Sequence, residues 1–254
     1  MNLRRCFVPL QLLFLLIAGL AAFGVGPAFG QETITLRNGQ TQQVVILGVT
    51  TSGIKIQMGG GVMVQPFGNV ASVTMNPPAE YAAAEFAYEK GDLKTALANA
   101  QSVVGNYLGL PTDWAQNALL TLGDIYIALN QIPQAEAVYN SFRRAYPAAG
   151  TAVVNVGLAR IDVSKKDYDA AKAKIDPILA DALKQRNLPK PVSALIGRAY
   201  YVSGQIEENA GDFSGALEDY LRTVAVFPDD RVAAANAQER ADSLRKDHEG
   251  LAVP

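Results

Sequence analysis

The chain has 254 residues, a formal net charge of −2, one cysteine and one histidine. A mildly acidic protein gains nothing from a phosphate backbone, so this composition argues against nucleic acid as a partner. One cysteine and one histidine cannot form a disulfide framework or a zinc site built from several such ligands.

The N-terminal end has the layout of a secretory signal peptide. Arg4 and Arg5 precede an apolar run over residues 10–22, and residues 28–30 (Ala-Phe-Gly) supply the small residues of a cleavage site. The alternative is an uncleaved anchor, but the apolar run is shorter than the roughly 20 residues that a spanning helix needs. Cys6 lies before this run, where no lipid-attachment cysteine is found. We therefore expect an exported protein, periplasmic or secreted, with no membrane contact after cleavage.

The next segment has the pattern of short antiparallel strands. Polar and apolar residues alternate in it, as in half-buried strands. Asn38-Gly39, between the first two predicted strands, is the strongest short signal for a hairpin. The predicted strands are residues 32–37, 43–49, 54–58, 62–65 and 70–75. Five short strands with glycine-rich turns predict a small, strongly bent antiparallel β-barrel.

In strand order and turns, this segment resembles the small SH3-like and Sm-like barrels. The resemblance to Sm-like proteins would imply RNA binding through basic and aromatic groups. The segment has only Arg37 and Lys55 as cations and only Phe67 as an aromatic residue. This departure argues against RNA as a ligand. A barrel of this size buries little surface, so we expect it to pack on the first helices through residues 76–78.

From residue 79 onward the pattern becomes helical and repeats. Each copy has a small or turn-forming residue, then aspartate or a near equivalent, a bulky residue, two more residues and alanine. The copies are residues 91–96, 130–135, 166–171 and 211–216. Their closing alanines recur at intervals of 36 to 45 residues, which is typical of a solenoid of paired helices. Such solenoids bind other molecules and rarely catalyse reactions.

The second helix pair is similar to a tetratricopeptide repeat. In this interpretation Gly123 and Ala135 are small because two helices cross closely there, and Tyr126 and Tyr139 fill the space around the crossing. The matching residues of this pair are Leu119, Leu122, Gly123, Tyr126, Ala135, Tyr139 and Pro147. The fourth pair matches at Tyr200, Gly204, Gly211, Phe213, Ala216, Tyr220 and Pro228, and the first and third match at fewer positions.

Together these patterns predict an α+β protein with two segregated domains. A small five-stranded antiparallel β-barrel is followed by an all-α solenoid of helical hairpins that resemble tetratricopeptide repeats. The expected divisions are a signal peptide (1–30), the barrel (31–76), about four helix pairs (79–228) and a C-terminal capping helix (229–249).

The sequence contains no recognisable set of catalytic residues. A serine–histidine–aspartate arrangement would have to use His248, because it is the single histidine of the chain, and it is near the end of the last predicted helix. Paired carboxylates such as Glu207-Glu208 are adjacent in sequence, and neighbours on a helix do not face one another. We expect no enzyme activity, no cofactor and no metal site. A carboxylate-dependent cell-wall enzyme is the alternative that this reasoning leaves open.

The resemblance to tetratricopeptide proteins implies that the first helix of each pair lines a concave face. The candidate partner-binding residues on that face are Tyr81, Glu85, Tyr88, Asn117, Asp124, Arg160, Arg198, Tyr201, Gln205 and Glu208. Arginine with tyrosine is the composition expected of a binding patch. In this prediction Arg160 and Arg198 are exposed and able to pair with a carboxylate of a peptide. The alternative is a hydrated surface without a ligand.

These observations favour a non-enzymatic, exported scaffold or adaptor that binds a protein or peptide through its concave face. It resembles the bacterial periplasmic tetratricopeptide proteins of cell-envelope assembly. A second possibility is a structural, self-associating envelope component, a homo-oligomer without a peptide ligand. The sequence does not identify the partner.

Overall fold

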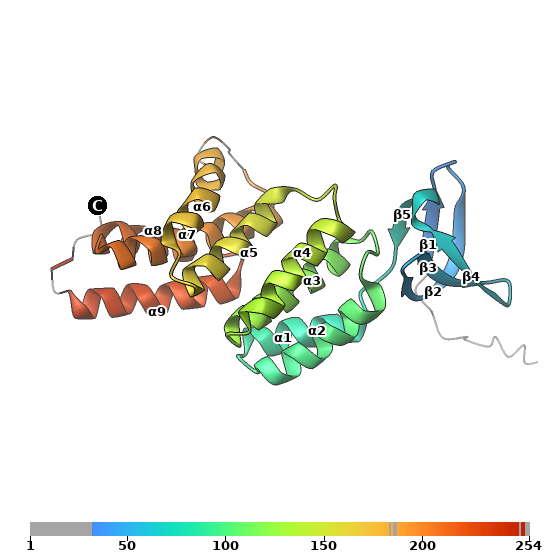
Figure 1. The fold of residues 1–254 in the computed structure, drawn as a ribbon, viewed down its shortest axis with the longest axis horizontal. Helices are drawn as coiled ribbons and strands as arrows, with labels where there is room; N and C mark the ends of the chain where they lie inside the picture. The colour runs from blue at the N-terminus through green and yellow to red at the C-terminus, as the bar shows by residue number, and fades with distance from the viewer. Residues whose placement is uncertain (1–31, 183, 185–186, 249, 252–254) are drawn as a thin grey trace, which may run out of the picture. The chain divides into compact units, whose positions relative to one another are not determined.

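The computed structural model describes residues 32–182, 184, 187–248 and 250–251, and in these residues a five-stranded antiparallel sheet is followed by nine α-helices (Figure 1). The predicted α+β class is confirmed. The predicted signal peptide, residues 1–30, lies outside the described residues. Among those that are described, no helix is both long enough and apolar enough to cross a bilayer.

The sheet is open, with the strand order β4-β3-β2-β1-β5. Its strands are β1 (Glu32–Leu36), β2 (Thr41–Thr50), β3 (Gly53–Met58), β4 (Gly61–Pro66) and β5 (Val70–Thr74). The expected closure into a barrel is not shown, because β4 and β5 are the two edges. The long strand β2 changes partner along its length: residues 41–44 pair with β1 and residues 45–50 pair with β3, with a shift in register between Ile46 and Gly48.

The predicted hairpin at Asn38-Gly39 joins β1 to β2. The backbone N–H of Leu36 donates to the carbonyl of Gln40 at 2.8 Å, and the Asn38 side-chain oxygen accepts from the Gln40 amide at 3.0 Å. Gly39 has φ +86°, a conformation that costs other residues more than glycine. The local turn chemistry therefore accounts for this connection.

A shared core joins the sheet to the helices. Ile34, Ile54 and Ile56 of the sheet are fully buried, and they belong to the same buried cluster as Trp114 of α3. The Trp114 indole N–H also donates to the carbonyl of Met75 at 3.0 Å. This hydrogen bond ties residue 75, at the start of the β5–α1 connection, to α3, whereas the sequence predicted packing on the first helices through residues 76–78.

The helices follow one another with short connections. They are α1 (Ala79–Glu89), α2 (Leu93–Tyr107), α3 (Asp113–Ala128), α4 (Ile132–Ala145), α5 (Thr151–Ser164), α6 (Tyr168–Ala182), α7 (Lys190–Ala210), α8 (Phe213–Ala225) and α9 (Arg231–Asp247). Consecutive helices pack in pairs, α1 on α2, α3 on α4, α5 on α6 and α7 on α8, and α9 packs on α8 (Figure 1). Contacts also run from each odd-numbered helix to the next, from α1 through α9.

The repeated sequence motif is the turn between the two helices of each pair. A residue with positive φ ends the first helix: Gly91, Asn130, Lys166 or Gly211. In three of these turns the following aspartate caps the second helix. The carboxylate of Asp92 accepts from the Thr95 amide at 3.1 Å, and Asp167 and Asp212 make equivalent contacts with the amides of Ala170 and Gly215. A left-handed residue followed by an N-capping aspartate is a local code for a helical hairpin.

Small residues permit the close helix contacts that the sequence predicted. The Tyr139 ring, from α4, is inserted between α3 and α5. A Cβ atom added at Gly123 would lie 2.9 Å from this ring, and one added at Gly157 would lie 2.2 Å from it. The same relation holds between Gly204 and Tyr220 in the fourth pair, at 2.6 Å. Each tyrosine thus fills a notch that glycine leaves open.

Candidate functional site

The odd-numbered helices share a hollowed face with two openings. The first opening has a volume of about 570 Å³ and the second about 470 Å³. Side chains of the first opening come from α1, α3, α5, α7 and α9, among them Tyr88, Ile127, Arg160, Tyr201 and Asn236. The second opening is lined from α1, α3, α5, α7 and the α8–α9 connection, by residues such as Glu85, Asn117, Val153, Lys190 and Asp229. Two mixed polar and apolar depressions therefore lie side by side.

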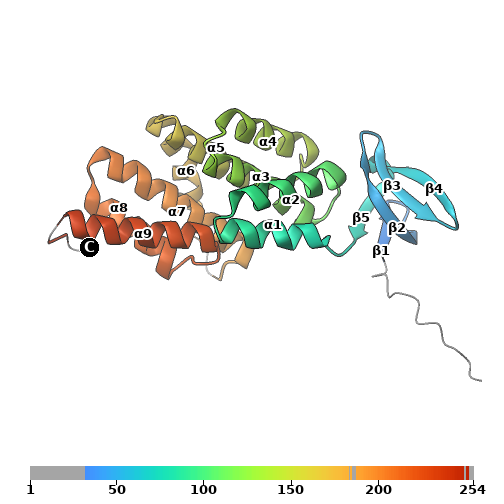
Figure 2. The same ribbon diagram turned by 90° about the horizontal axis from the view of Figure 1, so that it is seen from below.

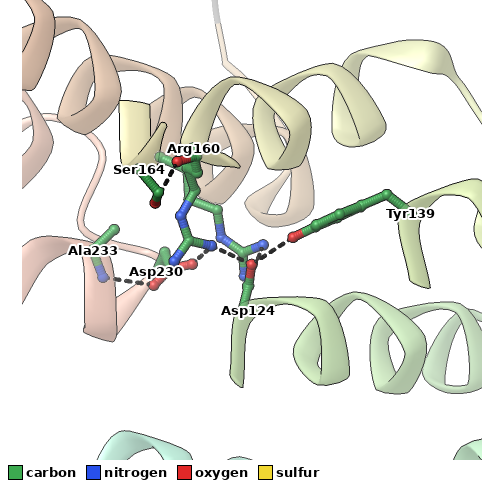
Figure 3. Close-up of polar contacts among 7 residues, drawn as sticks. Asp124, Tyr139, Arg160, Ser164, Asp230 and Ala233 are labelled. Carbon is green, nitrogen blue, oxygen red and sulfur yellow. Dashed lines mark hydrogen bonds and ion pairs between the residues drawn. The ribbon is translucent and has the colours of Figure 1, made fainter. Parts of the chain in front are cut away.

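Between the openings lies a cluster of two arginines and two aspartates, which we call the Arg–Asp cluster: Asp124, Arg160, Arg198 and Asp230. The side chain of Asp124 is only 3% exposed, and it forms ion pairs with Arg160 and, at 3.2 Å, with the Nη1 atom of Arg198. The Tyr139 hydroxyl donates to the same carboxylate at 2.8 Å. Figure 3 shows how Asp124, Tyr139, Arg160 and Asp230 converge from different elements.

Asp230 completes the cluster from the start of α9. Its Oδ2 atom accepts from Nε of Arg198, and its Oδ1 atom caps α9 by accepting from the Ala233 amide at 2.8 Å (Figure 3). The Arg160 and Arg198 side chains are 16% and 28% exposed. The expectation that these arginines are exposed and free to pair with a peptide is wrong, because folding supplies both with carboxylates from distant parts of the chain.

The ion pairs dominate the electrostatics of the cluster. Burial alone would lower the pKa of Arg160, but Asp124 together with the hydroxyls of Tyr88 and Tyr139 outweighs burial, and the pKa rises well above its ordinary value. Burial alone would raise the pKa of Asp230, but Arg198 and the Ala233 amide lower it below its ordinary value. Burial and the nearby Asp124 raise the pKa of the Tyr88 hydroxyl. Arg160 and Asp230 therefore keep their charges at neutral pH.

The other predicted residues form two groups at the ends of the concave face. At one end the Tyr81 hydroxyl donates to Oε1 of Glu85 at 2.6 Å, and Asn117 is exposed in the second opening. At the other end Gln205 lies in the first opening beside Tyr201, with its amide 3.4 Å from the tyrosine hydroxyl.

Glu208 lies apart from these groups. It accepts from the Tyr220 hydroxyl at 2.7 Å and pairs with Arg240. These contacts join α7 to α8 and α9. Glu208 therefore lies in a joint between helices and lines neither opening.

Two residues of this face were missed by sequence reasoning. Asp230 and Arg231 were interpreted only as the start of a capping helix. In the structure the Nη1 atom of Arg231 lies 3.2 Å from Oε2 of Glu89, so the first residue of α9 meets the last residue of α1 (Figure 2). The two residues are 142 positions apart, and no local signal could have revealed this contact.

The adjacent pair Glu207-Glu208 does separate, as its place on one helix predicted. Glu207 lies between α7 and α8, and one of its oxygens, Oε2, is buried and has no hydrogen-bond donor among the described residues. Burial, Asp219 and Asp212 raise its pKa from 4.5 to about 7, although Lys172 opposes this shift. Burial also raises the pKa of Asp219. Glu207 and Asp219 are packed at the joint between α7 and α8, with the exposed Asp212 at its edge, and none of the three lines either opening.

This joint predicts a pH dependence of stability. The folded protein holds a proton on Glu207 more tightly than the unfolded chain does, so stability falls as the pH rises from 4.5 to about 7. We expect Glu207→Gln to raise the melting temperature at about pH 8, by roughly 2–4 °C for each 1 kcal/mol of stability gained. The variant should also show a smaller fall in melting temperature between pH 4.5 and about 7. Thermal unfolding followed by circular dichroism measures both. Glu239→Gln, at an exposed site on α9, is the matched control; an equal effect from it would contradict this assignment.

Within the described part of the chain, no group of three or more acidic, histidine or cysteine side chains is placed to hold a metal ion. The single histidine, His248, stacks on Phe213 with ring centroids 3.8 Å apart. Comparison with protein-family models, with curated proteins and with solved structures found no match to this chain.

Proposed function

We propose that the protein is a non-enzymatic, exported scaffold or adaptor that binds a protein or peptide segment on the concave face of helical repeats of the tetratricopeptide kind. The observation that carries this proposal is the shared lining of the first opening, to which five successive odd-numbered helices contribute. A surface assembled from many repeats is extended, and an extended surface suits a chain segment better than a small metabolite. Tyrosine side chains and polar amides on its walls are typical of recognition surfaces.

The same proposal includes the small sheet. We interpret it as a strongly bent domain of the SH3-like kind, because β2 pairs with β1 at one end and with β3 at the other. A long strand that pairs with a different neighbour at each end allows the sheet to bend around a core. Its few cations and its single aromatic residue favour a protein contact over nucleic acid.

The test is capture of a partner by variants that block each opening. The mature chain is used to isolate partners from envelope extract, and the same capture is repeated with Ala128→Trp and with Asn117→Trp. Both residues are exposed, and each lines one opening. A tryptophan ring at either position would fill the opening and exclude the ligand. A loss of a few kcal/mol of binding free energy should reduce capture at least about tenfold. Ala83→Trp, an exposed site on α1 that lines neither opening, is the control. Full capture by both groove variants would overturn the proposal.

One observation favours self-association as the second candidate. Five apolar side chains are exposed on the strands β2 and β4: Val45, Leu47, Val62, Met63 and Val64. Since β4 is an edge of the sheet, its exposed apolar side chains favour contact with the edge of another chain. Light scattering on the same preparation distinguishes the two functions, since a structural oligomer would show a concentration-dependent mass without any partner.

A further inference from the structure

The chain itself crosses the concave face. The connection from α8 to α9 passes between the two openings, and Arg231 lines both of them. Val232 lines the first opening and Asp229 lines the second. In Figure 2 the first turn of α9 lies next to the end of α1. A segment that lay along the whole concave face would have to occupy the place that residues 229–232 hold.

Two ion pairs keep this segment in place. Asp230 is bound to Arg198 and is 9% exposed, so its pairing is largely shielded from water. Arg231 is bound to Glu89 at 3.2 Å and is 79% exposed. An exposed pair of this kind contributes only about 0–1 kcal/mol. The rest of α9 is held by its alanine face, since Ala237 and Ala241 pack on α8. Release of the first turn from the concave face therefore requires a replacement for the Asp230–Arg198 pair, whereas the rest of the helix can stay attached to α8.

Charge indicates what could take the segment's place. Within the Arg–Asp cluster two positive and two negative groups balance. Without the carboxylate of Asp230, Arg198 would share Asp124 with Arg160, and the face would carry one uncompensated positive charge. An acidic side chain from another segment would restore the balance, because guanidinium groups bind carboxylates with strong, charge-assisted hydrogen bonds.

We propose that residues 229–232 are an internal occupant of the concave face, in competition with a partner segment that presents an acidic side chain to Arg198. This inference rests on the proposed function of that face. A tethered competitor acts at an effective concentration of roughly millimolar, so the internal segment lowers the affinity for external peptides. The partner is then an acidic peptide segment, and its binding displaces the first turn of α9.

The experiment uses residues 31–254 and a labelled peptide with the sequence of residues 228–240, Pro-Asp-Asp-Arg-Val-Ala-Ala-Ala-Asn-Ala-Gln-Glu-Arg. Asp230→Asn in the protein removes the competing charge and keeps a good helix cap, while Arg198 retains Asp124. Fluorescence anisotropy should show the peptide binding to this variant at least about tenfold more tightly than to the unmodified protein. A peptide with asparagine at both aspartate positions should bind neither protein. Equal affinity of the acidic peptide for both proteins, or equal binding of the two peptides, would overturn the inference.

A second variant keeps the test independent of the buried cluster. Arg231→Glu places like charges at the exposed contact with Glu89, so hydrogen exchange in the first turn of α9 should become faster. The charge swap Glu89→Arg with Arg231→Glu should restore the original exchange. Unchanged exchange in Arg231→Glu would show that this contact does not hold the segment. If the blocking variants Ala128→Trp and Asn117→Trp reduce partner capture but Asp230→Asn leaves peptide affinity unchanged, this inference fails and the proposed function stands.

Discussion

Replacing Gly157 by alanine is expected to destabilise the protein, although alanine is the better helix former. The new Cβ atom would lie 2.2 Å from the Tyr139 ring. That ring cannot move aside, because it is 2% exposed, hydrogen-bonded to Asp124 and packed against Gly123 on its other side. Overpacking of this kind costs about 1–3 kcal/mol.

Gly105→Ala is the matched control for this prediction. Gly105 lies inside α2, and a Cβ atom there would meet nothing within 4 Å. The same substitution should therefore stabilise the protein by about 0.5–1 kcal/mol, since glycine in a helix loses more backbone entropy. Urea unfolding of the two variants should give shifts of opposite sign. Shifts of the same sign would mean that the Tyr139 ring is not seated between α3 and α5.

Replacing Asp124 by asparagine is expected to destabilise the protein by about 3–5 kcal/mol, because it leaves a buried guanidinium without its counter-ion. Arg160 has no other ion-pair partner among the described residues, whereas Arg198 still has Asp230. The same reasoning predicts that Arg160→Ala combined with Arg198→Ala destabilises the fold, since Asp124 and Asp230 would remain buried. The sequence predicted that both arginines are exposed, and removal of exposed charges would change stability by only about 0–1 kcal/mol.

Two further variants make this second prediction specific. Lys165→Met breaks an ion pair with Glu136 in which both side chains are at least 40% exposed, and it should change stability by no more than about 1 kcal/mol. Asp124→Leu with Arg160→Met removes the buried pair completely and should recover much of the loss, because apolar replacements of a buried pair are often tolerated. Equal unfolding midpoints for Asp124→Asn and Lys165→Met would contradict the buried character of the cluster.

If these results hold, the binding variants must be chosen away from the cluster. A loss of partner capture by a variant at Arg160 or Arg198 would report unfolding as much as a lost contact. Ala128 and Asn117 are better positions, since both are exposed and neither takes part in an ion pair described above. The separation of stability from recognition thus follows from which side chains are buried.

Local chemistry in the sequence determined the secondary structure and its order. Asn38-Gly39 specified a hairpin because its backbone conformation and side-chain hydrogen bond involve only neighbours in the chain. Gly91-Asp92 and Gly211-Asp212 specified helical hairpins for the same reason, with a left-handed residue followed by a helix cap. Glycine at 123 also indicated a close crossing, because a missing side chain is itself a packing signal.

Tertiary structure alone decided which charged groups meet between distant helices. Arg160 pairs with Asp124 across 36 positions and Arg231 with Glu89 across 142. The angles at which successive helix pairs stack set both contacts, and small differences at each interface add up along the row of helices. A sequence pattern that repeats once in each helical hairpin does not specify the angles between successive hairpins. For this reason the sequence indicated some of the residues that line the two openings, such as Arg160 and Arg198, whereas only the folded chain showed that these arginines are already paired and that the start of the C-terminal helix lies between the openings.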